Sequence, residues 1–200
     1  KTGERVISFF FDDIVEKYSA NEKVILHIND LKEDMVEHIN KFKGQQKASA
    51  NPFSIQKEDP KKFFERYKVN LFIDNSDRIG APIVNETNPT YYNLTGMMEY
   101  KNEMGFLTTS FMDIKPGALH KANGGFLILN VKDLFSHQFA WEGLKRSLKT
   151  NKVTIETLNK QYGYIVTATL KPEPIDMDLK VILIGDYYTY SVLFSYDEDF

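Results

Sequence analysis

The sequence contains no cysteine, which excludes a disulfide framework, a thiolate metal site and a cysteine nucleophile. It also lacks the about 20 consecutive apolar residues that a membrane-spanning helix needs. Its longest apolar run, at residues 126–129, has only the length of a strand. Glu4, Asp12 and Asp13 fall where a signal peptide would need its apolar core. We therefore expect a cytoplasmic protein with no membrane partner.

A large excess of one charge is missing too. The 25 basic and 28 acidic residues leave a net charge of −3, which argues against a surface that binds polyanions as a whole. Four basic residues do cluster at the end of an expected helix, namely Lys145, Arg146, Lys149 and Lys152. Cations there complement the helix dipole, although they would also suit phosphate groups. We favour the structural interpretation and keep nucleic acid as a weak alternative partner.

Two catalytic motifs are absent as well. No G-x-x-x-x-G-K-[ST] occurs, so the sequence lacks the amides and the lysine that would hold the β- and γ-phosphates of a nucleotide. The histidines His27, His38, His120 and His137 form neither an i, i+4 pair nor an H-E-x-x-H motif. We therefore predict no metal ligands here, and interpret the histidines as surface or hydrogen-bonded core residues.

Two amphipathic helices are predicted at the N-terminus. Apolar residues recur at helical spacing over residues 6–17, and again from residue 24 to 42 after Asn21, a favourable N-cap. We expect a helical hairpin over residues 1–44. Residues 45–60 are rich in Gln, Lys, Ser and Asn and predict a linker, so a second domain would cover residues 61–200.

The second domain alternates strand and helix patterns. Strands are expected at residues 67–74, 105–108, 125–129, 153–156, 164–169 and 179–184, and helices at 116–122, 139–149 and 187–194. This order predicts an α/β domain with a mainly parallel sheet flanked by helices. The runs at 125–129 and 179–184 look buried on both faces, as central strands are. Residues 152–156 and 164–169 are predicted to form an inserted β-hairpin.

One long segment resembles a known family. Residues 115–130, K-P-G-A-L-H-K-A-N-G-G-F-L-I-L-N, resemble the approach to the Walker B strand in Lon-family proteases. Further segments at 74–77, 80–82, 88–91, 98–100, 139–146 and 172–175 resemble the bacterial Lon-like branch in the same order. The resemblance is strong over residues 67–200. It is weak over the N-terminal helices, which resemble the end of a helical insertion.

The resemblance implies a partial AAA+ fold of the P-loop NTPase type, from an ATP-dependent serine endopeptidase with a Ser-Lys pair. It implies ATP and Mg²⁺ as cofactors of the full-length protein, a homo-oligomeric ring, and unfolded or damaged proteins as substrates. The family places its phosphate loop before Lys1 and its peptidase beyond Phe200. We therefore expect an internal fragment that has no catalytic residue of its own and binds no cofactor alone.

The resemblance also marks a nucleotide site. The Walker B acids, which hold Mg²⁺ and orient water, are replaced by Asn130 and Val131, and nearby Asp133 compensates only in part. This predicts weak or absent ATP hydrolysis. A plain core strand followed by a turn is the alternative for this segment. Asp186, after the strand at 179–184, is a candidate sensor of the γ-phosphate or a helix N-cap.

Phe111 and Met112 align with the family's pore loop, where an aromatic-aliphatic pair grips an unfolded chain by apolar contact. The alternative is that this pair belongs to the core. Two functions stay open at this point. The first is a motor segment that passes unfolded chains to a peptidase, and the second is a non-hydrolysing AAA+ scaffold or protein-binding module.

Overall fold

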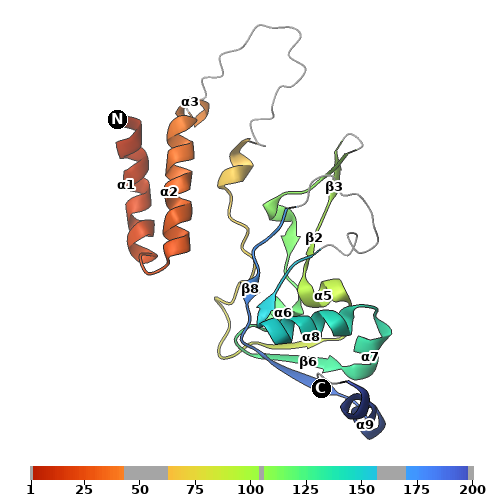
Figure 1. The fold of residues 1–200 in the computed structure, drawn as a ribbon. Helices are drawn as coiled ribbons and strands as arrows, with labels where there is room; N and C mark the ends of the chain where they lie inside the picture. The colour runs from red at the N-terminus through yellow and green to blue at the C-terminus, as the bar shows by residue number, and fades with distance from the viewer. Residues whose placement is uncertain (1, 43–62, 104–105, 157–169, 198–200) are drawn as a thin grey trace. The chain divides into compact units, whose positions relative to one another are not determined.

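The computed structural model describes residues 2–42, 63–103, 106–156 and 170–197 (Figure 1). The chain divides into two compact units, residues 1–68 and residues 69–200. Each is described by itself below. The linker expected at residues 45–60 lies outside the described residues.

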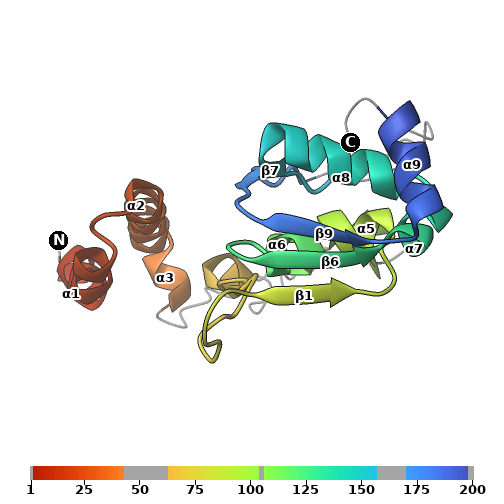
Figure 2. The ribbon, with the colours of Figure 1, turned by 90° about the horizontal axis from the view of Figure 1, so that it is seen from below.

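The first unit is built on the predicted helical hairpin. Its elements are α1 (Thr2–Lys17), α2 (Glu22–Glu37), α3 (Ile39–Phe42) and the 3₁₀ helix η1 (Glu65–Tyr67). Helices α1 and α2 lie side by side (Figures 1 and 2). The predicted N-cap is confirmed, because the Asn21 side chain accepts a hydrogen bond of 3.2 Å from the Val24 amide.

Residues 63–67 pack against these helices. The ring of Phe63 meets those of Phe42 and Tyr67 edge to face. Arg66 and Tyr67 both donate hydrogen bonds to the Asp34 carboxylate. The Tyr67 hydrogen bond lowers the pKa of Asp34, and burial raises the pKa of Tyr67 to about 12. Residues 63–67, which we expected to belong to the second domain, therefore group with the N-terminal helices.

The second unit is organised around a three-stranded parallel sheet. Its order is β1 (Ile83–Glu86), β6 (Phe126–Asn130) and β9 (Lys180–Ile184). Phe126 lies beside Ile83 on one side and beside Lys180 on the other. The predicted parallel sheet is confirmed for the runs at 125–129 and 179–184, because the strand that ends at Asn130 and the strand that precedes Asp186 are parallel neighbours (Figure 2).

Short elements fill the connections between these strands. From β1 to β6 they are α5 (Tyr91–Thr95), β2 (Met97–Met98), β3 (Lys101–Glu103), β4 (Phe106–Thr108), η2 (Phe111–Asp113), β5 (Ile114–Lys115) and α6 (Ala118–Lys121). From β6 onward they are α7 (Val131–Ser136), α8 (Ala140–Thr150), β7 (Lys152–Val153), β8 (Ile175–Asp176) and, after β9, α9 (Tyr187–Tyr196). Three antiparallel pairs, β2 with β5, β3 with β4 and β7 with β8, accompany the main sheet. The helices predicted at 116–122, 139–149 and 187–194 are confirmed.

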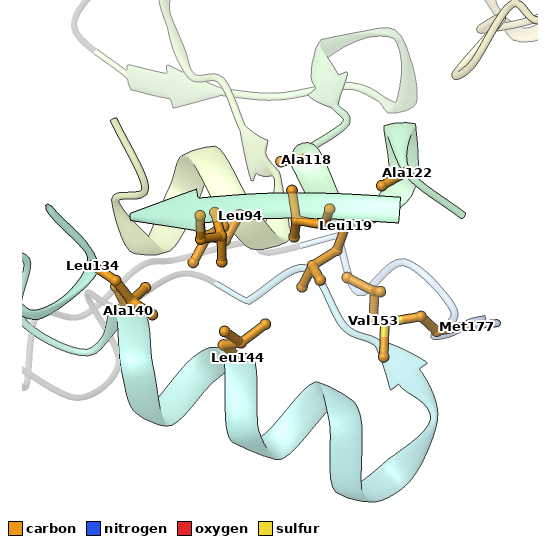
Figure 3. Close-up of a cluster of buried hydrophobic side chains, with 11 residues drawn as sticks. Leu94, Ala118, Leu119, Ala122, Leu134, Ala140, Leu144, Val153 and Met177 are labelled. Atoms are coloured by element: carbon orange, nitrogen blue, oxygen red, sulfur yellow. The ribbon is translucent and has the colours of Figure 1, made fainter. Parts of the chain in front are cut away.

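One face of the sheet carries the core (Figure 3). Leu127 and Leu129 of β6 are fully buried there, together with Leu94 of α5, Leu119 of α6 and Leu144 of α8. Alternate residues of a strand point to opposite faces, so the side chains at 127 and 129 reach the same helices. The predicted α/β fold with a helix-covered parallel sheet is thus confirmed.

Pro82 and Gly125 approach closely where β1 and β6 begin. The Phe126 amide donates a hydrogen bond of 2.8 Å to the Pro82 carbonyl. A Cβ on Gly125 would lie 2.0 Å from that carbonyl oxygen, a distance that no side chain tolerates. The glycine therefore permits β1 to join the sheet beside β6.

The strand expected at residues 67–74 is wrong, because residues 68–73 form no strand. Side chains hold this segment instead. The Asn70 amide donates to the Phe111 and Ile114 carbonyls at 2.9 and 3.2 Å, and the Phe72 ring lies 4.9 Å from that of His120. Alternating apolar residues made the segment look like a strand, but they do not supply a pairing partner.

Two other strand predictions need correction. Ile182 and Ile184 of β9 are 44% and 54% exposed, so this strand is not buried on both faces. In residues 153–156 only Val153 belongs to a strand, and β7 pairs with β8. The partner expected for it at 164–169 lies outside the described residues.

His120 is a core histidine held in its neutral form. It is 5% exposed, and its Nδ1 accepts a hydrogen bond of 3.2 Å from the Gly117 amide. Burial lowers its pKa from 6.5 to about 4. Between these values the unfolded chain binds a proton that the folded chain refuses, so stability is lost as pH falls from about 6.5 toward 4.

We predict a loss of about 3 kcal/mol over that pH interval, since one pKa unit corresponds to about 1.4 kcal/mol. Urea unfolding followed through the fluorescence of Trp141, the single tryptophan, measures it in the second unit. His120→Asn should remove most of the pH dependence. The same change at exposed His27 is the control, and equal pH slopes for His120→Asn and the unmodified chain would contradict the prediction.

Candidate nucleotide site

The carboxyl ends of the parallel strands gather polar residues at one edge of the sheet. Strand β1 ends at Glu86, β6 ends at Asn130, and β9 is followed by Gly185 and Asp186. Asn130 lies beside Ile184 in the register. Open α/β sheets bind ligands outside the carboxyl ends of their strands. The structure thus brings the predicted residues Asn130 and Asp186 to the edge where a ligand is expected.

Asn130 caps helix α7. Its Oδ1 accepts a hydrogen bond of 2.9 Å from the Lys132 amide, which α7 leaves without an intrahelical partner. An asparagine serves this purpose as well as an aspartate does. The strand-to-helix turn is therefore kept without the charge that a metal ligand would contribute.

Val131 belongs to the core. It is 4% exposed, and a Cβ on Gly185 would lie 3.3 Å from its Cγ2, so its side chain packs under the end of β9. A carboxylate at this position would be buried at a large cost in free energy. Asp133, two residues on, is exposed on α7, and its backbone carbonyl accepts a hydrogen bond of 2.7 Å from the Ser136 hydroxyl.

Asp186 caps helix α9. Its Oδ1 accepts hydrogen bonds of 2.8 Å from both the amide and the hydroxyl of Thr189, and its Oδ2 lies 3.1 Å from the Lys132 Nζ. The Thr189 amide and hydroxyl, followed by Lys132, hold the pKa of this carboxyl at about 2. The N-cap interpretation is confirmed, while the sensor role stays a prediction.

Two residues at this edge escaped the sequence analysis. Lys132 joins the ends of β6 and β9 through Asp186. Glu86 ends β1, and its Oε1 accepts a hydrogen bond of 2.9 Å from the Asn88 amide. The only signal for Glu86 was its place two residues before the N-P-T at 88–90. The partner of Lys132 depends on the pairing of β6 with β9.

These side chains do not fit Mg²⁺. The cation prefers charged oxygen ligands, but Asn130 is neutral and its oxygen is engaged, Val131 is apolar, and Asp186 already has an ammonium partner. Within the described ranges, no group of three His, Cys, Asp or Glu residues is arranged to hold a metal ion. What remains at the edge is an ion pair, two helix caps and the single carboxylate of Glu86.

Phe111 and Met112 lie in the 3₁₀ turn η2, and both are half-buried. The Asp113 carboxylate accepts hydrogen bonds of 3.0 Å from the amide and the hydroxyl of Ser110, which closes the turn. The hydrogen bond from Lys101 lowers the pKa of Asp113. The candidate pore pair thus sits on a braced turn, and its role stays a prediction.

The basic end of α8 is largely neutralised. Lys145 Nζ lies 3.0 Å from Glu142 and 3.1 Å from Asp197, and the Trp141 indole donates to the same Asp197 at 2.7 Å. Arg146 pairs with Glu156, and Lys152 with Asp176. These pairs support the structural interpretation of the cluster.

A parallel sheet with helices on one face and polar caps at its carboxyl edge defines the second unit as a partial P-loop-NTPase-like α/β domain. A family model described as "LonB-like, AAA domain" matches residues 79–200. The chain therefore belongs to the LonB-like AAA domain family, and its second unit is an ATPase-type AAA+ module.

Other comparisons add little. No curated protein matches the chain. Among solved structures it is similar to NtrX from Brucella abortus, with 18% identity over 60% of this chain and 24% of that chain, and a TM-score of 0.36. The chain thus spans about a quarter of that protein, and so low a score supports no argument. No helix among the described residues is long and apolar enough to cross a membrane.

The cap role of Asn130 predicts a contrast between two substitutions. Asn130→Ala should lower the free energy of unfolding by about 1 kcal/mol, because the Lys132 amide loses its acceptor. Asn130→Asp keeps an acceptor and should stay within about 0.5 kcal/mol of the unmodified chain. Urea titration followed by Trp141 fluorescence measures both. Equal destabilisation by the two changes would show that the hydrogen bond is not what Asn130 contributes.

Proposed function

We propose that this chain is a motor segment of a Lon-like ATP-dependent serine protease. In this proposal the carboxyl edge of β6 and β9 contacts nucleotide within a homo-oligomeric ring. The ring passes unfolded polypeptide to a Ser-Lys peptidase domain outside the chain. The parallel pairing of β6 with β9, which brings Asn130 beside Ile184 and so brings Asn130 and Asp186 to the same edge of a LonB-like AAA domain, is the observation that supports it.

ATP hydrolysis by this segment is weak or absent. An attacking water needs a carboxylate to orient it, and the phosphates need charge stabilisation during transfer. At the two positions that would supply carboxylates stand a neutral cap and a buried valine. Lys132 is a cation at this edge that a phosphate group could engage in place of Asp186, but an ammonium group does not activate a water.

A non-hydrolysing AAA+ scaffold is the second candidate. The Lys132–Asp186 ion pair favours it, because each side chain already neutralises the other and joins two neighbouring strand ends. Nucleotide binding by the full-length protein separates the candidates. A motor segment binds nucleotide, while a pure scaffold leaves it unbound.

Turnover of ATP tests the chemistry. We expect the full-length protein with Mg²⁺ to bind a fluorescent ATP analogue but to turn over far below the about 1–10³ s⁻¹ typical of enzymes. Asp133→Ala should change neither quantity, because Asp133 lies exposed on α7 beyond the strand ends. Robust hydrolysis that survives Asp133→Ala would show that ATP hydrolysis does not depend on carboxylates at positions 130, 131 and 133.

The pore role of Phe111 predicts a split between two activities. Phe111→Ala should abolish degradation of a folded protein substrate, because the grip is apolar contact, and should leave cleavage of a small peptide unchanged. Ile79→Ala, at a fully exposed residue of the same unit, is the matched control. If Phe111→Ala degrades folded substrate at the normal rate, Phe111 does not grip the chain.

A further inference from the structure

The segment at residues 69–73 forms no strand, yet the burial of its side chains alternates. Val69 and Leu71 are 82% and 68% exposed, while Asn70 and Phe72 are half-buried. This alternation places Asn70 and Phe72 on the same side of the segment, turned toward the protein. A polar amide in such a position needs hydrogen-bond partners, because leaving it without them costs free energy.

Asn70 finds its partners at the two ends of the turn η2. Its Nδ2 donates hydrogen bonds of 2.9 Å to the Phe111 carbonyl and 3.2 Å to the Ile114 carbonyl. Only the NH₂ group of an asparagine can donate, so two carbonyl acceptors define which way the amide faces. Phe111 begins η2, and Ile114 is its C-cap, whose own amide also donates to the Phe111 carbonyl. One side chain therefore spans the turn from its first residue to its cap.

Other contacts hold the turn at a different point. The Asp113 carbonyl accepts a hydrogen bond of 2.9 Å from the Glu99 amide, and the Asp113 carboxylate lies 2.5 Å from the Lys101 Nζ. These contacts act on Asp113. Asn70 instead acts on the carbonyl of Phe111, which is one of the two candidate pore residues.

Phe72 anchors the segment to the core. Its ring lies 4.9 Å from the ring of His120, with an angle of 83° between the two planes. His120 is buried on α6, and its neighbours Ala118 and Leu119 are fully buried as well. A helix packed in this way is a fixed support. Because Asn70 stands only two residues before Phe72, its amide holds η2 at a defined position relative to the core.

We propose that Asn70 is a positioning residue for the candidate pore turn. Phe111 and Met112 are half-buried, so only part of each side chain is open to a substrate. The two hydrogen bonds from Asn70 keep the backbone of η2 in one conformation, and a polypeptide therefore meets an apolar surface that is already ordered. Ordering a surface in advance reduces the conformational entropy lost on binding. The inference deepens the proposed function, and rests on it for the role of Phe111.

The test measures degradation by the full-length protein of a reduced, carboxymethylated protein that cannot refold, beside cleavage of a small peptide. Asn70→Ala removes the donor, and Asn70→Asp replaces it with an acceptor of the same size. Both should raise KM for the unfolded protein about tenfold, the effect of losing two hydrogen bonds, and leave kcat for the peptide unchanged. Far-ultraviolet circular dichroism checks that each variant is folded.

Two further variants serve as rescue and control. Asn70→Gln keeps the donor on a side chain one methylene longer, and should limit the rise in KM to about threefold. Asn93→Asp, on α5, removes a side-chain hydrogen bond of 2.8 Å to the Asn88 carbonyl. This is the same chemical change at a carbonyl outside η2, so KM should stay unchanged.

A double-mutant cycle separates positioning from general damage. Phe111→Ala removes the side chain that Asn70 positions, so adding Asn70→Ala to it should raise KM little further. A residue that only stabilised the fold would raise KM by the same factor in both backgrounds. That result, or a normal KM for Asn70→Ala alone, would overturn the proposal.

Hydrogen exchange of the full-length protein examines the turn without any activity. The amides of Asp113 and Ile114 are hydrogen-bonded within η2, and Asn70→Ala should speed their exchange about tenfold while α8 is unaffected. Unchanged exchange would overturn the proposal. Failure of the motor proposal gives a different result, in which Phe111→Ala has no effect on degradation while Asn70→Ala still speeds exchange in η2.

Discussion

The parallel pairing of β6 with its two neighbours is the constraint on which the second unit depends. Pro82 and Gly125 approach so closely that only a glycine fits, and this contact sets β1 beside β6 from the first residue of each strand. On the other side, the register with β9 brings Asn130 level with Ile184. The burial of the β6 leucines and the Lys132–Asp186 pair both follow from these two alignments.

The residues at the carboxyl edge serve the fold in ways that do not require catalysis. Asn130 and Asp186 cap the helices that follow β6 and β9, and Val131 fills the space beneath Gly185. An amide serves the capping need at position 130 as well as an acid would, and a valine serves the packing need at position 131 better than an acid would. The caps and the packing at positions 130 and 131 therefore need no catalytic acid, and the fold does not depend on whether the module hydrolyses ATP.

Sequence patterns correctly predicted those helices and strands that are specified by residues close together in the chain. The cap residues Asn21 and Asp186 and the apolar runs of β6 and β9 specify helix starts and strands through neighbouring atoms. The sequence could not show that residues 68–73 lack a strand partner, or that Ile182 and Ile184 stay exposed. The pairing of Lys132 with Asp186 was hidden for the same reason, since it joins residues 54 positions apart only through the β6–β9 register.

Two exposed apolar surfaces, on α9 and on the α1–α2 hairpin, differ in the number of charged residues around them. On α9, Tyr187, Tyr188 and Phe194 are exposed in a helix that contains no charged residue, so nothing there selects among apolar partners. On the α1–α2 hairpin, Phe9 and Phe10 are exposed in a stretch, residues 2–42, that contains nine acidic and five basic residues. Both surfaces offer apolar contact, but only the hairpin adds a net negative charge, so only there would the charge of a partner change the free energy of contact.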